Sequence, residues 1–137
     1  MRQVTKPRRA RQGGNTILEM ALGMTVFLMC LFGAMEFGRA VFVYNSLAYL
    51  SHQGARWAMV RGSASPTPAT ATTVNSYVQG IANGMAPGGI TVTTVWTPST
   101  APGSTVKVTT AFNFDFIAPY MPGDMTLRSS STMTILQ

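Results

Sequence analysis

The chain has 137 residues, 10% of them charged, and a formal net charge of +6. This length suits one small globular domain with an anchor, and the charged fraction is far below the roughly one quarter that is usual in soluble domains. Half of the Lys and Arg residues precede Gly13, so the rest of the chain is nearly neutral and carries no basic surface of the kind that binds nucleic acid. Cys30 is the one cysteine, which excludes a disulfide within the chain.

Residues 1–14 are predicted to be an unstructured basic leader. The segment contains Pro7, the pair Gly13-Gly14 and five basic residues, which are Arg2, Lys6, Arg8, Arg9 and Arg11. Basic residues beside an apolar span stay on the cytoplasmic side of a membrane. We therefore expect residues 1–14 in the cytoplasm and everything after about Glu36 on the other side of the cell (inner) membrane.

An apolar run follows the leader, and Glu19 is the one charged residue between Asn15 and Met35. About twenty apolar residues span a bilayer as a helix, which predicts a transmembrane segment at about residues 16–36. A cleaved secretory signal has a shorter apolar region and a small-residue cleavage site, so a retained single-pass anchor is favoured. A carboxylate within a span is costly unless it is neutralised, which makes Glu19 a candidate functional residue.

The helical pattern continues beyond the span. Apolar and small residues recur at three- and four-residue steps, at Phe37, Val41, Tyr44, Leu47, Ser51, Ala55 and Ala58, while Arg39 lies on the polar face. Gly62 and Pro66 are the first residues that stop a helix, so one helix is predicted over residues 15–61. A domain or a neighbouring subunit must cover the apolar stripe of its second half.

A Ser/Pro linker at residues 62–69 precedes a predicted domain at residues 70–137. A short helix comes first, with Thr70, Thr72 or Thr73 as its cap and Pro87-Gly88-Gly89 as its end, and its apolar face is Val74, Tyr77, Val78, Ile81, Ala82 and Met85. Three strands with one apolar face each follow, joined by residues 98–104 and 119–124. Short connections favour an antiparallel meander. The predicted fold class is α+β, with the domain packed on the outer half of the long helix.

Nothing in the sequence predicts an enzyme. His52 is the one histidine, and no nucleophile is paired with a base. No cluster of metal ligands and no glycine-rich phosphate loop occurs, so no cofactor is expected.

The residues at the start of the predicted transmembrane segment form a recognisable pattern. Gly14 is followed by N-T-I-L and then Glu19. This resembles the processing site of type IV prepilins, where a membrane peptidase cuts after a glycine and glutamate becomes the fifth residue. A cut after Gly14 would leave a free amine at Asn15, and the amine of one subunit can neutralise Glu19 of its neighbour. The alternative is a glutamate that reaches the membrane surface beside incidental glycines.

Two further motifs narrow the resemblance. The segment E-M-A-L…G-A-M-E-F-G-R-A, followed by Y-N-S-L-A…G-A-R-W-A, resembles the TadE-like family of minor pilins or pseudopilins between Gly14 and about Ala58. The sequence departs from the family where Met20 replaces a common aromatic residue and Thr25 a common proline. The second departure predicts a straighter membrane helix.

The resemblance implies a bitopic protein that a prepilin peptidase processes and that acts with other pilins and the assembly machinery of Tad (Flp) pili, in adherence or biofilm formation. The implied processing residues are Gly14, Asn15 and Glu19, and the candidate subunit-assembly residues are Glu19, Glu36, Phe37 and Arg39. Glu36 and Arg39 can pair within the helix or between subunits, and both options stay open. The competing hypothesis is a membrane-anchored extracytoplasmic binding or scaffold module that is not processed.

Overall fold

The computed structural model describes residues 13–83, 89–117 and 123–136. Its elements are the helices α1 (Gly13–Met59) and α2 (Ala71–Ala82) and the strands β1 (Thr91–Thr97), β2 (Thr105–Asp115) and β3 (Asp124–Thr134). This confirms the predicted α+β class, with a long helix, a short helix and a three-stranded antiparallel sheet. The chain divides into two compact units, the anchor unit (residues 1–35) and the globular unit (residues 36–137), and α1 contributes to both.

The described part of the anchor unit is the first half of α1. Its apolar side chains are exposed, with exposed fractions of 73% at Ile17, 68% at Leu22 and 59% at Phe27. The apolar stretch of this helix is not buried by the rest of the protein. The helix is therefore long and apolar enough to cross a membrane, which fits a single-pass anchor.

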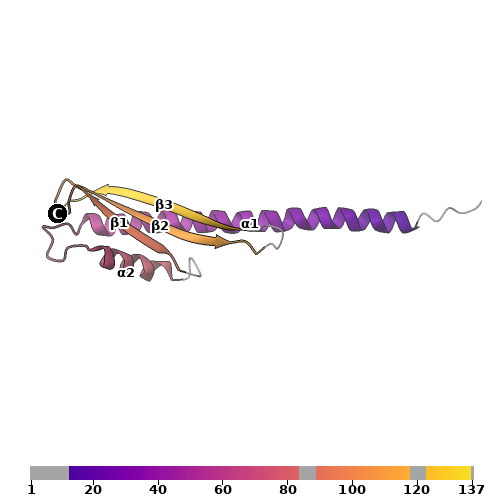
Figure 1. Cartoon of the computed structure of the whole chain (residues 1–137), viewed down its shortest axis with the longest axis horizontal. Coiled ribbons are helices and arrows are strands. Elements are labelled where there is room, and N and C mark those ends of the chain that lie inside the picture. The colour runs from indigo at the N-terminus through magenta and orange to yellow at the C-terminus, as the bar shows by residue number, and fades with distance from the viewer. Residues whose placement is uncertain (1–12, 84–88, 118–122, 137) are drawn as a thin grey trace, which may run out of the picture. The chain divides into compact units, whose positions relative to one another are not determined.

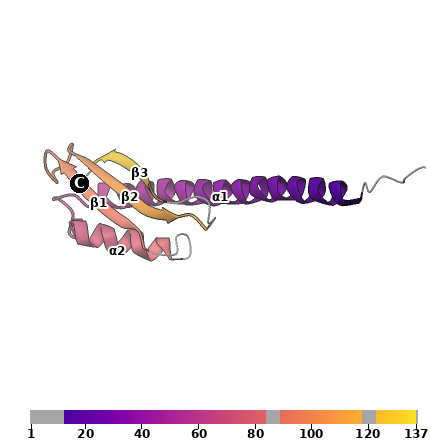
Figure 2. The same ribbon diagram turned by 45° about the vertical axis from the view of Figure 1, so that its right-hand side comes forward.

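In the globular unit the sheet packs against the second half of α1, and α2 lies beside the sheet (Figures 1 and 2). The strand order is β1-β2-β3, and both pairs are antiparallel. Val108 of β2 lies opposite Thr94 of β1 and Ser131 of β3. These three positions share one face, because side chains alternate along each strand. That face turns toward the helices, and it buries Val106, Val108, Thr110 and Phe114 of the central strand.

The core of the globular unit lies between the two helices and the one covered face of the sheet. Its fully buried side chains include Leu47 and Leu50 of α1, Val74 and Val78 of α2, and Val108 of β2. Thr110 is buried among them, and its hydroxyl donates to the carbonyl oxygen of Leu47 at 2.9 Å. This bond ties the central strand directly to the backbone of α1.

Gly54 marks the closest approach of α1 to the rest of the core. A Cβ atom at this position would lie 2.8 Å from Cγ2 of Val78 and 3.1 Å from Cγ1 of Val108. Carbon atoms do not approach to 2.8 Å without displacement, so only glycine fits here. The absence of a side chain lets α2 and β2 meet α1 at one point.

The N-terminal end of α2 and the C-terminal end of α1 both have identifiable partners. Thr70 is the N-cap of α2 and forms a capping box with Thr73, which decides among the three threonines that the sequence offered. At the end of α1, the carbonyl of Met59 accepts from the backbone N–H of Leu136 at 3.0 Å. The final carbonyls of a helix lack partners inside it, so this bond satisfies one of them and fixes the C-terminal segment.

The globular unit covers only the later part of the predicted apolar stripe of α1. Leu47, Ser51, Ala55 and Ala58 are buried as expected, but Phe37, Val41 and Tyr44 have exposed fractions of 73%, 41% and 50%. The covered face there consists of Glu36, Ala40 and Val43, one position earlier. The covered face differs from the stripe there because two charged residues, Glu36 and Arg39, turn toward the sheet.

The basic residues of the leader lie outside the described residues, as do Met85, the Pro87-Gly88 pair and residues 118–122. The sequence-predicted long helix at 15–61 is observed as Gly13–Met59, so both ends shift by two residues.

Candidate functional site

The globular unit begins with Glu36, whose side chain is 8% exposed. One of its carboxylate oxygens, Oε1, accepts a hydrogen bond of 2.9 Å from the backbone N–H of Ile117, just after β2. A buried carboxylate needs such donors, because it has lost water that would otherwise solvate it. Glu36 therefore connects α1 to a residue 81 positions later in the chain.

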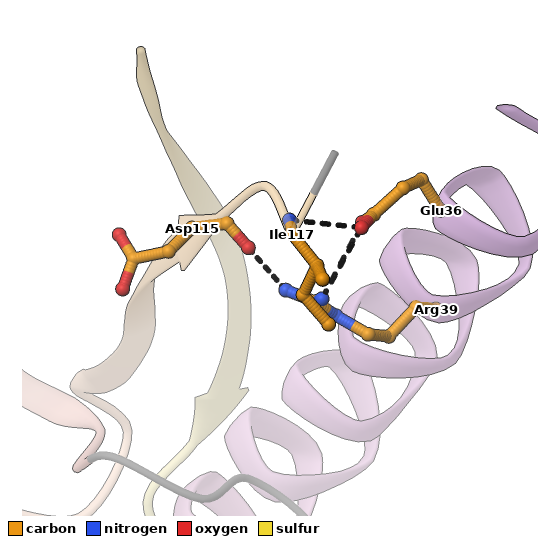
Figure 3. A network of polar contacts seen from close by, with 4 residues as sticks. All are labelled: Glu36, Arg39, Asp115 and Ile117. Atoms are coloured by element: carbon orange, nitrogen blue, oxygen red, sulfur yellow. Dashed lines mark hydrogen bonds and ion pairs between the residues drawn. The ribbon is translucent and has the colours of Figure 1, made fainter. Parts of the chain in front are cut away.

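Arg39 completes this connection from the next turn of the helix (Figure 3). Its Nη1 lies 3.4 Å from Oε2 of Glu36, and its Nη2 donates to the backbone carbonyl of Asp115. The guanidinium carbon lies 4.3 Å from the centre of the Phe114 ring, within the range of a cation–π contact. We call Glu36, Arg39 and the backbone of Asp115 and Ile117 the Glu36–Arg39 cluster.

The cluster compensates both charges inside one chain. Oε2 of Glu36 meets Arg39 as an ion pair but has no hydrogen bond among the described residues. Of the two arrangements that the sequence left open, the structure contains the pair within the helix. A pair between subunits remains a prediction.

Phe37, the remaining candidate of this segment, points away from the domain and is 73% exposed. Four further apolar or aromatic side chains of the same helix segment are also exposed, and we call the five together the free face of α1: Phe37, Val41, Phe42, Tyr44 and Tyr49. Exposed apolar side chains gathered on one helix segment are a common feature of surfaces that bind another molecule.

The candidate processing residues Gly14, Asn15 and Glu19 all lie on the first two turns of α1 and are exposed. The Gly14–Asn15 bond is inside the first turn of α1, so the predicted cut would require that turn to unwind. Glycine disfavours a helix by about 1 kcal/mol relative to alanine, so the Gly13-Gly14 pair lowers the cost of unwinding. Glu19 meets no cation among the described residues.

The G-A-R-W-A segment also has a physical role that the sequence did not reveal. Gly54 provides the close approach described above, and Ala55 and Ala58 are fully buried. Trp57 stacks on Tyr77 of α2 with ring centres 5.2 Å apart, and Arg61 covers the Trp57 ring at 4.2 Å. The segment thus joins α1 to α2.

Sequence reasoning also missed Asp115 and Ile117 as partners of Glu36. A signal was present in the charged pair three residues apart that interrupts an apolar helix, because buried charges need partners. The sequence did not say where those partners lie. Within the described parts of the chain, no group of three His, Cys, Asp or Glu residues is placed to hold a metal ion.

The fold and the exposed apolar helix define a class, a small α+β unit carried on a helix that can span a membrane. Residues 14–56, about a third of the chain, match the family model described as TadE-like protein. The resemblance predicted from the sequence is therefore confirmed over that segment, which contains Glu19 and the Glu36-to-Arg39 motif. No curated protein and no solved structure matches the chain. The family match and the apolar helix fit a Tad-associated membrane protein.

Proposed function

We propose that this protein is a minor pilin or pseudopilin of a Tad (Flp) pilus, a bitopic membrane protein that acts in pilus assembly and so in adherence or biofilm formation. The observation that carries the proposal is the TadE-like match, because it starts at Gly14 and covers Glu19 and the motif from Glu36 to Arg39. The exposed apolar helix supports the anchoring role.

In this proposal a prepilin peptidase removes residues 1–14 and leaves Asn15 as the new N-terminus. The new amine then neutralises Glu19 of a neighbouring subunit within the lipid, where an unpaired carboxylate is costly. The basic leader keeps the N-terminus in the cytoplasm, and the globular unit lies outside the inner membrane.

The free face of α1 is the proposed contact with neighbouring subunits. Its five apolar side chains are exposed next to the end of the span, while the opposite face is used by the sheet. Helices pack closely when apolar side chains interlock, so an adjacent pilin helix is a suitable partner.

N-terminal sequencing of the protein extracted from membranes tests the processing step. A chain that begins at Asn15 is expected. An intact Met1 in cells with an active prepilin peptidase would contradict the proposal and favour the unprocessed binding or scaffold module.

A variant pair tests the charge within the span. Glu19→Ala is expected to insert normally but to reduce the number of pili, because the amine of the neighbour loses its partner. Met20→Ala is the matched control, since Met20 is exposed at the same depth. Normal pilus numbers in Glu19→Ala would refute the pairing.

A further inference from the structure

Ile117 is an exposed apolar residue that the structure holds in a defined position. Its side chain is 77% exposed, yet its backbone N–H donates to Glu36 at 2.9 Å. Two residues earlier, the carbonyl of Asp115 accepts from Arg39. Figure 3 shows both bonds, which fasten the end of β2 to the first turns of α1 within the globular unit.

The position of Glu36 in the sequence determines how far Ile117 lies from the membrane surface. The transmembrane segment is predicted to end at about residue 36, and the globular unit begins at Glu36. Because these segments are covalently continuous, Glu36 lies at the membrane surface whatever the relative placement of the two units. Ile117, bonded to Glu36, lies at the same level. This step rests on the anchoring role in the proposed function.

The charged residues near the end of β2 limit how deeply this end of the globular unit can enter a membrane. Glu36 is buried and Arg39 is engaged in the cluster, so neither presents a free charge. Asp115 and Asp124 pair in register at the ends of β2 and β3, and both are exposed. Carboxylates are costly in hydrocarbon, so these two must remain in water and the contact must be shallow.

We propose that Ile117 rests at the boundary between lipid headgroups and acyl chains, so that the globular unit sits on the bilayer in which the chain is anchored. Apolar and aromatic side chains are stable at this boundary because their nonpolar parts leave water while nearby polar groups stay hydrated. The bonds of the Glu36–Arg39 cluster then hold the end of β2 at the membrane surface.

A pair of labelled variants tests this contact in the full chain. Ile117→Cys and Leu136→Cys are made in a Cys30→Ala background and labelled with an environment-sensitive fluorophore. Leu136 is a matched control, since it is 63% exposed and is bonded through its N–H to Met59, at the far end of α1. The 23 helical steps from Glu36 to Met59 place it about 35 Å from the membrane end.

The labelled chains are placed in phosphatidylcholine vesicles at low protein density, with a nitroxide lipid that quenches near the headgroups. The label at 117 is expected to shift to the blue and to be quenched, and the label at 136 to show neither effect. Adding Glu36→Ala to Ile117→Cys should reduce the quenching, because the N–H of residue 117 loses its acceptor.

Three outcomes would overturn the inference. The label at 117 can behave as in water although the chain resists carbonate extraction, both labels can be quenched alike, or the blue shift can appear only at high protein density, which would indicate a second copy as the partner. A chain that carbonate removes from the vesicles would instead refute the anchor, and with it the proposed function.

Discussion

Replacing Gly54 with alanine is expected to destabilise the globular unit, although alanine is the better helix former. The new Cβ would lie 2.8 Å from Cγ2 of Val78 and 3.1 Å from Cγ1 of Val108. Both valines are fully buried, and their branched side chains are restricted at χ1, so neither can turn aside freely. The core must therefore shift by a few tenths of an ångström or more.

Two opposing effects set the size of the loss. Overpacking a well-packed core costs about 1–3 kcal/mol. Alanine gains about 1 kcal/mol over glycine within a helix. The expected net change is a loss of up to about 2 kcal/mol in the free energy of unfolding.

Gly38→Ala is the matched control on the same helix, because a Cβ there would meet nothing within 4 Å. This variant should be neutral or stabilised by up to about 1 kcal/mol, and the difference between the two variants isolates the packing effect. The assay is urea unfolding of the full chain in detergent micelles, followed by tryptophan fluorescence, since Trp57 and Trp96 both lie in the globular unit.

A third variant tests whether the loss of stability in Gly54→Ala comes from the contact with Val78. Val78→Ala removes the nearest atom, so the cost of Gly54→Ala should be smaller in that background than in the wild type. The reasoning would be refuted by a Gly54→Ala variant at least as stable as Gly38→Ala.

Two further comparisons use the same unfolding assay. Thr110→Val should lower the free energy of unfolding by about 1 kcal/mol, because the Thr110 hydroxyl donates to the carbonyl of Leu47. Thr94→Val should be neutral or stabilising, because the buried hydroxyl of Thr94 has no partner among the described residues. Equal effects of the two substitutions would contradict this assignment. Glu36→Ala should lower the free energy of unfolding by about 1–3 kcal/mol. Glu36→Gln should lower it less, since the amide oxygen can still accept from the N–H of Ile117. A Gln variant as unstable as the Ala variant would show that this hydrogen bond is unimportant.

The elements of this fold were predictable because their signals are local. The change from a helical period to a period of two at Ile90, and the glycines and prolines between the segments, predicted each helix and strand. The alternation along β2 and β3 also predicted which side chains face the core, including Val106, Val108 and Phe114. Thr110 was not predicted as a buried residue, because its acceptor is a helix carbonyl 63 positions away.

The face of α1 that meets the domain was not predictable in the same way. Charged residues normally face water, so the sequence places Arg39 on the polar face of the helix and Phe37 in the apolar stripe. The backbone of Asp115 and Ile117 reverses this arrangement by supplying partners for both charges. The same reversal leaves the aromatic free face of α1 available to another molecule.

The sequence by itself determined the apolar span, the candidate cut at Gly14, the order of the elements and the TadE-like motifs, because each depends on composition or spacing within a short stretch. Only the tertiary structure decided which structural roles the residues of two of those motifs have. Gly54 is required where two other elements approach α1, and Glu36 with Arg39 holds the end of β2. Both roles depend on atoms more than twenty residues away, and local sequence carries no information about such distances.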